Sequence, residues 1–200
     1  RLQIGHTWSA NISYWGSNIC RAGWIAQGAE DLPLEARDYV ASFAGPYFEA
    51  MAEGLNKIRI GQPGGVLHRL IQERLPFEKF GIFLNPGHLI HLDEWVSSPV
   101  YAGSEIQIQA GMVIQTDVIP SSPVYFSTRM EDGVAIVDQS LRDEIQRRFP
   151  DCYHRCQARR RFVEEVLGIE LPDEVFPLSN MACIVSPYLL RPQQIFALQS

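Results

Sequence analysis

The first half of the chain changes from strand-like to helical patterning. Residues 2–26 are rich in β-branched and aromatic side chains with polar breaks between them, which predicts a hairpin or a three-stranded meander. Residues 31–57 have apolar positions at helical spacing after an Asp and an early Pro, and we expect Gly45-Pro46 to kink or break this helix. A second helix is expected at 66–75, where the leucines and the isoleucine share one face.

The second half begins with short apolar runs between Gly and Pro residues, a pattern that predicts short strands. We expect these strands at 80–84, from His88, and at 105–109, 112–119, 125–130 and 133–137. Helical spacing then returns from 140 to 167, with a second helix starting at 149–151. The Pro-rich tail, 172–192, is expected to pack across the surface.

Composition narrows the class of protein. A chain of 200 residues with 46% apolar content can bury a core without disulfides or metals. The net charge of −6 argues against a nucleic-acid partner, and no apolar run reaches the roughly 18 residues of a membrane span. The four cysteines form no dense framework, so a reduced, cytoplasmic setting is expected. Because the chain starts at Arg1 and enters a strand at once, we expect it to be the C-terminal part of a longer protein.

One imidazole and two carboxylates stand at the ends of successive strand-like runs. They are His88 after Gly87, Asp117 in an apolar strand, and Glu131. Side chains of these types, brought to one point by strands, predict a hydrolytic or metal-binding cleft. The two carboxylates each have an alternative, purely structural explanation. Asp117 needs a partner if buried and could form a structural salt bridge with Arg21 or Arg129. Glu131 alone would fit a hairpin turn at 131–133.

The motifs around these residues resemble, in order, those of the pita-bread family, which includes methionine aminopeptidase, aminopeptidase P, prolidase and creatinase. The motifs are Tyr14…Asn18-Ile19-Cys20-Arg21, Gly87-His88, Gly111-Met112…Asp117 and Arg129-Met130-Glu131-Asp132. The resemblance covers roughly residues 5–137. It implies an α+β fold: a strongly curved antiparallel sheet with helices outside and a cleft on its concave face. We therefore expect residues 1–200 to form a single pita-bread-like domain.

In the metal-dependent members of that family five residues bind two cations, and the resemblance puts three of them on His88, Asp117 and Glu131. The second hairpin aspartate falls on Asn18 and the first near Thr7, so two charged ligands are missing. Hard divalent cations prefer charged oxygens. We therefore expect no metal pair and predict no metal ligand. A single manganese, zinc or cobalt ion on His88, Asp117 and Glu131 stays an alternative.

The family's other histidine also has no counterpart, and His91 or Asp93 could take the proton-shuttling role. The resemblance implies a hydrolase-type enzyme, related to Xaa-Pro peptidases and creatinase, that cleaves a small amide or C–N bond. His88 would be the general acid or base, and either Asp117 or Glu131 would stay protonated through their mutual repulsion.

We expect Asn18, His91 and Asp93 to contact the substrate, which would be a small molecule or a peptide. The alternative is a non-catalytic pseudoenzyme that keeps the cleft to bind a peptide or small ligand. A homodimer, or association with an upstream domain, would cover the open edge of the sheet.

Overall fold

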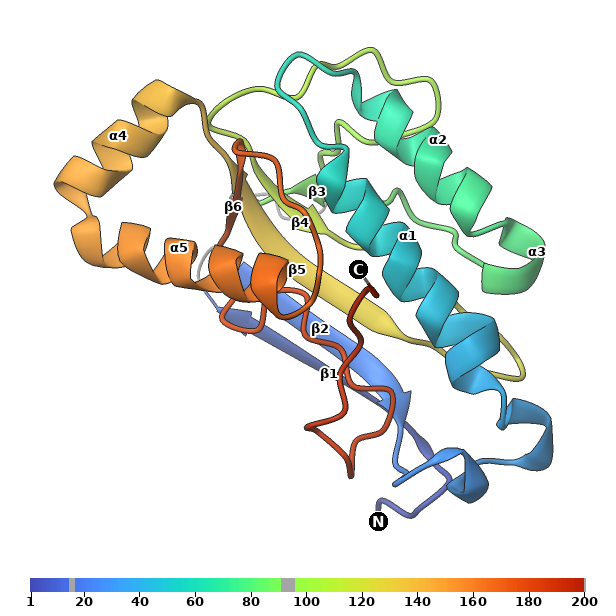
Figure 1. Cartoon of the computed structure of the whole chain (residues 1–200). Helices are drawn as coiled ribbons and strands as arrows, with labels where there is room; N and C mark the ends of the chain where they lie inside the picture. The colour runs from blue at the N-terminus through green and yellow to red at the C-terminus, as the bar shows by residue number, and fades with distance from the viewer. Residues whose placement is uncertain (15–16, 91–95, 200) are drawn as a thin grey trace.

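A computed structural model describes residues 1–14, 17–90 and 96–199. Its centre is a curled antiparallel sheet in the spatial order β1-β2-β5-β4-β3, with β6 paired to β5 (Figure 1). The strands are β1 (Thr7–Tyr14), β2 (Ser17–Trp24), β3 (His88–Leu89), β4 (Val113–Thr116), β5 (Arg129–Ile136) and β6 (Val175–Pro177). The long strand β5 pairs with β2 through its first half and with β4 and β6 through its second half, so it ties the sheet together.

Helices cover one side of this sheet (Figure 1). They are α1 (Gly45–Asn56), α2 (Gly64–Arg74), α3 (Phe77–Phe80), α4 (Gln139–Arg148) and α5 (Pro150–Glu165). Tyr47 joins α1 to the sheet, because its hydroxyl donates to the carbonyl of Val118 at 2.9 Å and accepts from the amide of Met130 at 2.9 Å. None of the described helices is both long and apolar enough to cross a bilayer.

Several predicted elements are confirmed. The N-terminal hairpin, α2, the strand starting at His88, β4, and the pair α4 and α5 lie where the pattern placed them. At Gly45-Pro46 the helix changes type: a π-helical stretch, Val40–Ala44, gives way to α1, and Pro46 sits in the first turn of α1. Proline is tolerated there because the amides of a first turn have no partner within the helix.

Two predicted strands are wrong. Residues 80–84 form no strand: α3 ends at Phe80, Gly81 takes a left-handed conformation with φ +54°, and Phe83 is 80% exposed. Residues 105–109 contribute only an isolated bridge between Pro63 and Gln107. Their backbone serves the start of α2 instead.

Two further expectations need correction. Residues 125–130 and 133–137 do not flank a turn, because β5 runs unbroken through Glu131, Asp132 and Gly133. The tail does not only cross the surface. It adds β6 at the edge of β5 and buries Ala182, Cys183 and Val185 in the core.

Candidate active site

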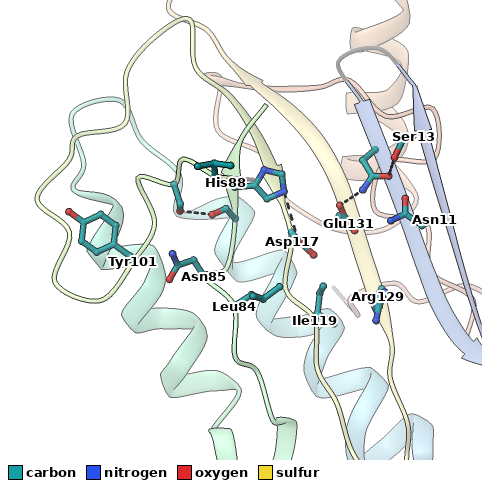
Figure 2. A pocket seen from close by; sticks show the side chains of 14 residues that line it. Asn11, Ser13, Leu84, Asn85, His88, Tyr101, Asp117, Ile119, Arg129 and Glu131 are labelled. Carbon is teal, nitrogen blue, oxygen red and sulfur yellow. Dashed lines mark hydrogen bonds and ion pairs between the residues drawn. The ribbon is translucent and has the colours of Figure 1, made fainter. Parts of the chain in front are cut away.

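A cleft of about 570 Å³ opens on the face of the sheet that α1 does not cover. Side chains from four strands reach into it, and loops before β3 and β4 complete its wall (Figure 2). The polar and charged residues from the strands and their ends are Asn11, Ser13, Asn18, His88, Asp117, Arg129 and Glu131.

Strand alternation explains which residues face the cleft. Along β5, Arg129 and Glu131 point into the cleft, whereas Met130 packs in the hydrophobic core and Asp132 accepts from the amide of Cys183 on the opposite face. Asp117 follows the end of β4, which pairs with β5 through Thr116 and Asp132. The sheet therefore brings Asp117 next to Glu131 although 14 positions separate them in the sequence, as the two residue numbers show.

The glycine of the Gly-His motif has a steric reason. Gly87 adopts φ +143°, and a Cβ atom there would lie 3.0 Å from the carbonyl oxygen of Gln115 in β4. Only glycine allows this close approach, which sets His88 opposite Gln115 in the β3–β4 pairing.

His88 presents one ring nitrogen to the cleft. Its Nδ1 lies 3.1 Å from the carbonyl oxygen of Leu89, an acceptor, so Nδ1 carries the proton. Nε2 is then free as a base or ligand and lies 4.0 Å from Oδ2 of Asp117. One ligating atom from each of His88, Asp117 and Glu131 lies within 4.8 Å of the others. Figure 2 shows the three side chains around one space.

Amide and hydroxyl groups hold Glu131 in place. Asn18 donates from Nδ2 to Oε1 of Glu131 at 2.6 Å, and Gln115 donates from Nε2 to the same oxygen at 3.3 Å. Ser13 donates to Oδ1 of Asn18 at 3.1 Å, which fixes the orientation of that amide. Glu131 is 4% exposed, so these bonds replace the water that a surface carboxylate would have.

The two carboxyl groups are difficult to ionise together. Burial, followed by the charge of Asp117, raises the pKa of Glu131 to about 7. Burial also raises the pKa of Asp117, against the lowering effect of His88 and Arg129. Oδ1 of Asp117 is buried and has no hydrogen-bond partner among the described residues. The site therefore holds one carboxyl group, that of Glu131, with a pKa near neutral pH, and an oxygen of Asp117 that a ligand could satisfy.

Solved structures share this architecture. The chain superposes on an Xaa-Pro dipeptidase from Bacillus anthracis with a TM-score of 0.55 and 20% identity, over 70% of this chain and 38% of that one. Prolidases from Thermococcus sibiricus and Pyrococcus furiosus give TM-scores of 0.52 and 0.50 at 20% identity, over 66% and 69% of this chain. This chain has the pita-bread fold.

At such identity the likeness shows the fold alone. The chain spans 38%, 35% and 40% of the lengths of these three structures. No protein-family model matches it, and no curated protein does.

Within the pita-bread sheet, the structure brings together four of the residues proposed from the sequence: Asn18, His88, Asp117 and Glu131. His91 and Asp93 lie outside the described residues.

The alternative salt bridge of Asp117 with Arg21 does not form. Arg21 lies on the other face of the sheet, where Nη2 contacts both carboxylate oxygens of Asp132 at 2.9 Å. Arg129 lies near the cleft acids but donates from Nη1 to Sγ of Cys20 at 3.3 Å. Among the described residues, Nε2 of His88 is the only basic side-chain nitrogen within 4.0 Å of the carboxyl group of Asp117.

The part of the cleft wall formed by the β1–β2 hairpin, which we call the hairpin wall, contains other residues than expected. Thr7, the position matched to the first hairpin aspartate, pairs with Trp24 and does not line the cleft. Asn11 and Ser13 of the same strand line it instead. The sequence carried a signal for them, because polar and apolar residues alternate from Trp8 to Tyr14.

These side chains fit one divalent cation and do not fit two. His88, Asp117 and Glu131 offer a nitrogen and two carboxylate oxygens at bonding reach of one ion, and the free Oδ1 of Asp117 adds an acceptor. The hairpin wall offers only the neutral Asn11, Ser13 and Asn18. A second cation would stand there with no anionic ligand from β1 or β2.

Proposed function

We propose that this chain is a hydrolase-type enzyme that cleaves a small amide or C–N bond in the cleft. The observation that carries the proposal is the meeting of His88, Asp117 and Glu131, whose ligating atoms lie within 4.8 Å of one another. These groups come from three separate segments of the sequence, and the two acids are buried or half-buried. Such a cluster in a concave site is the arrangement that acid–base hydrolysis requires.

Each group has a distinct role in this proposal. His88, with Nε2 free, accepts a proton from the attacking water. Asp117 lies 4.0 Å from that nitrogen and stabilises the imidazolium that forms. Glu131, with a pKa of about 7, carries a proton in part of the molecules at neutral pH and donates it to the departing nitrogen. Asn18 orients Glu131 and borders the space for the substrate.

A single cation is an alternative to these roles, because a nitrogen or oxygen bound to it could not also accept or donate the proton. His88, Asp117 and Glu131 would hold it, and when bound it would supply Lewis acidity. The proton transfers assigned above to His88 and Glu131 belong to the metal-free case, which is the one we favour because Asn11, Ser13 and Asn18 offer no anionic ligand.

A second candidate function is supported by the neutral cleft wall. Asn11, Ser13 and Asn18 stand at the hairpin, and amides with hydroxyls are groups that bind peptides without cleaving them. In that case the chain is a pseudoenzyme, and its cleft binds a peptide or a small ligand.

Substitution of His88 separates the two functions. We expect His88→Ala to lower hydrolysis of a true substrate by at least about 100-fold, the range attributed to a general base, while a pseudoenzyme would keep its ligand affinity. Xaa-Pro dipeptides and creatine are the first compounds to assay, with release of the amine or amino acid as the readout.

The matched control is His154→Ala, since His154 is exposed on α5 and lies outside the cleft. Hydrolysis that survives His88→Ala at the rate of the control would contradict the catalytic role. Failure of every amide and C–N compound to react, with ligand binding preserved, would favour the pseudoenzyme.

A further inference from the structure

Gln115 is a buried amide beside the cleft that the proposed reaction does not use. Its side chain is fully buried on β4, opposite His88. Its Nε2 donates to the backbone carbonyl of Asn18 and to Oε1 of Glu131. Gln115 therefore joins β4 to the hairpin through bonds that span 97 and 16 positions of sequence.

Gly133, in the neighbouring strand β5, leaves space for the side chain of Gln115. A Cβ atom at Gly133 would come to 3.3 Å of Oε1 of Gln115 and to 3.4 Å of Ile90. A Cβ atom at Gly133 would therefore crowd the end of the Gln115 side chain, which would have to shift by a few tenths of an ångström. The glycine in the middle of β5 has a packing reason, because its φ lies in the ordinary range.

Asn18 completes the same arrangement from the other side. Its Nδ2 donates to Oε1 of Glu131 at 2.6 Å while Ser13 donates to its Oδ1 at 3.1 Å. Reversing the amide would break the bond from Ser13 and set an oxygen against the carboxylate of Glu131. Oε1 of Glu131 thus receives two N–H donors of fixed orientation.

We infer that Asn18 and Gln115 are positioning residues that limit the cleft to at most one divalent cation. A cation needs lone pairs, and the two amides point hydrogens at the oxygen that a second ion would need. Only Oε2 of Glu131 remains for the cleft, together with His88 and Asp117. The inference deepens the proposed function and rests on the site assigned there.

The test counts manganese ions bound to the full chain by equilibrium dialysis, with no turnover required. Wild-type protein should bind no more than one Mn²⁺ per chain. Asn18→Asp replaces one donor by an anionic ligand and should raise the count to two, with a weaker second site than in the double variant because Gln115 still donates to Oε1 of Glu131. The double variant Asn18→Asp with Gln115→Glu removes both donors and should also bind two.

Asn85→Asp is the matched control. Asn85 lines the cleft from the loop before β3 and makes no hydrogen bond to Glu131, so the same change of charge should leave the count at the wild-type value. If Asn18→Asp is unfolded without metal because three acids then repel, addition of Mn²⁺ should refold it, as followed by circular dichroism.

Two results would overturn the inference: wild-type protein that binds two ions, or both variants remaining at one ion or fewer. Neither result depends on hydrolysis. A chain that turned out not to be an enzyme would still give a clear count, and a chain with the wrong count could still lose its activity on His88→Ala.

Discussion

The pKa of Glu131 is set by neighbours with opposite effects. The N–H groups of Asn18 and Gln115 favour its ionised form, whereas burial and the charge of Asp117 favour the protonated form. Burial is the largest of these effects, and the pKa rises to about 7. The folded protein therefore binds a proton at Glu131 over a pH range in which the unfolded chain has released it.

This linkage gives the first stability prediction. With a folded pKa of about 7 and an unfolded value near 4.5, the folded state binds more protons between these limits, so stability falls as pH rises through them. Glu131→Gln keeps an acceptor for Asn18 and removes the titration. Relative to wild type, the variant should gain up to about 3 kcal/mol of unfolding free energy between pH 4 and pH 8, measured by urea denaturation with chelator present.

Glu105→Gln is the control for loss of a surface acid, because Glu105 is exposed and remote from the cleft. It should change stability little at either pH. A Glu131→Gln variant whose gain does not grow with pH would show that Glu131 is ionised in the fold already at low pH.

At the scale of elements, the start of α2 depends on close backbone contact. Pro63 precedes α2 and offers no side-chain cap. The free amides of Gly64 and Gly65 donate instead to the carbonyls of Ile106 and Ser104, at 2.9 and 3.1 Å. The loop that the sequence pattern presented as a strand is therefore used to cap a helix.

Gly64→Ala tests this arrangement. A Cβ atom at Gly64 would lie 2.0 Å from the carbonyl oxygen of Pro99, which is backbone and cannot move aside. We expect a loss of about 3 kcal/mol or more in unfolding free energy, measured by denaturant titration. The paired variant Gly54→Ala lies inside α1, where the new atom would meet Ile71 at 3.5 Å. It should be neutral or stabilise by about 0.5–1 kcal/mol, and equal losses in both variants would refute the steric argument.

The elements that sequence predicts well are those whose signal is local. Helical spacing, a proline at the start of the second C-terminal helix and a Gly-His turn located α2, α5 and β3. The strand expected at 80–84 failed because an apolar run of that length fits a short helix and an exposed loop equally well. The turn expected at 131–133 failed because pairing with β2 and β4 extends β5 through it.

The residues of the candidate site also fall into those with a local sequence signal and those without one. His88, Asp117 and Glu131 were predicted because each lies in a short motif of fixed order. Gln115 was not, because its bonds reach Asn18 across 97 positions and leave no pattern in the sequence near it. The family resemblance matched the first hairpin aspartate to Thr7, whereas alternation along β1 puts Asn11 and Ser13 at the cleft.

At the scale of the molecule, β1 is an edge strand of the sheet, and the two-residue strand β3 is the edge strand at the other end. The order β1-β2-β5-β4-β3 leaves β1 with β2 as its only paired strand among the described residues. Ile12, in the middle of β1, is 68% exposed. An edge strand with an exposed apolar side chain invites pairing with another chain.

We propose that two copies of the chain associate through β1 and form a homodimer. Light scattering across a range of concentrations should give the dimer mass for wild type. Ile12→Lys puts a charge on the edge, the device by which natural edge strands avoid pairing, and should shift the mass to that of a monomer without loss of helix or strand signal. Leu34→Lys is the matched control, because Leu34 is 78% exposed in a helical turn outside the sheet. A wild-type monomer at all concentrations, or a dimer that survives Ile12→Lys, would contradict association through β1.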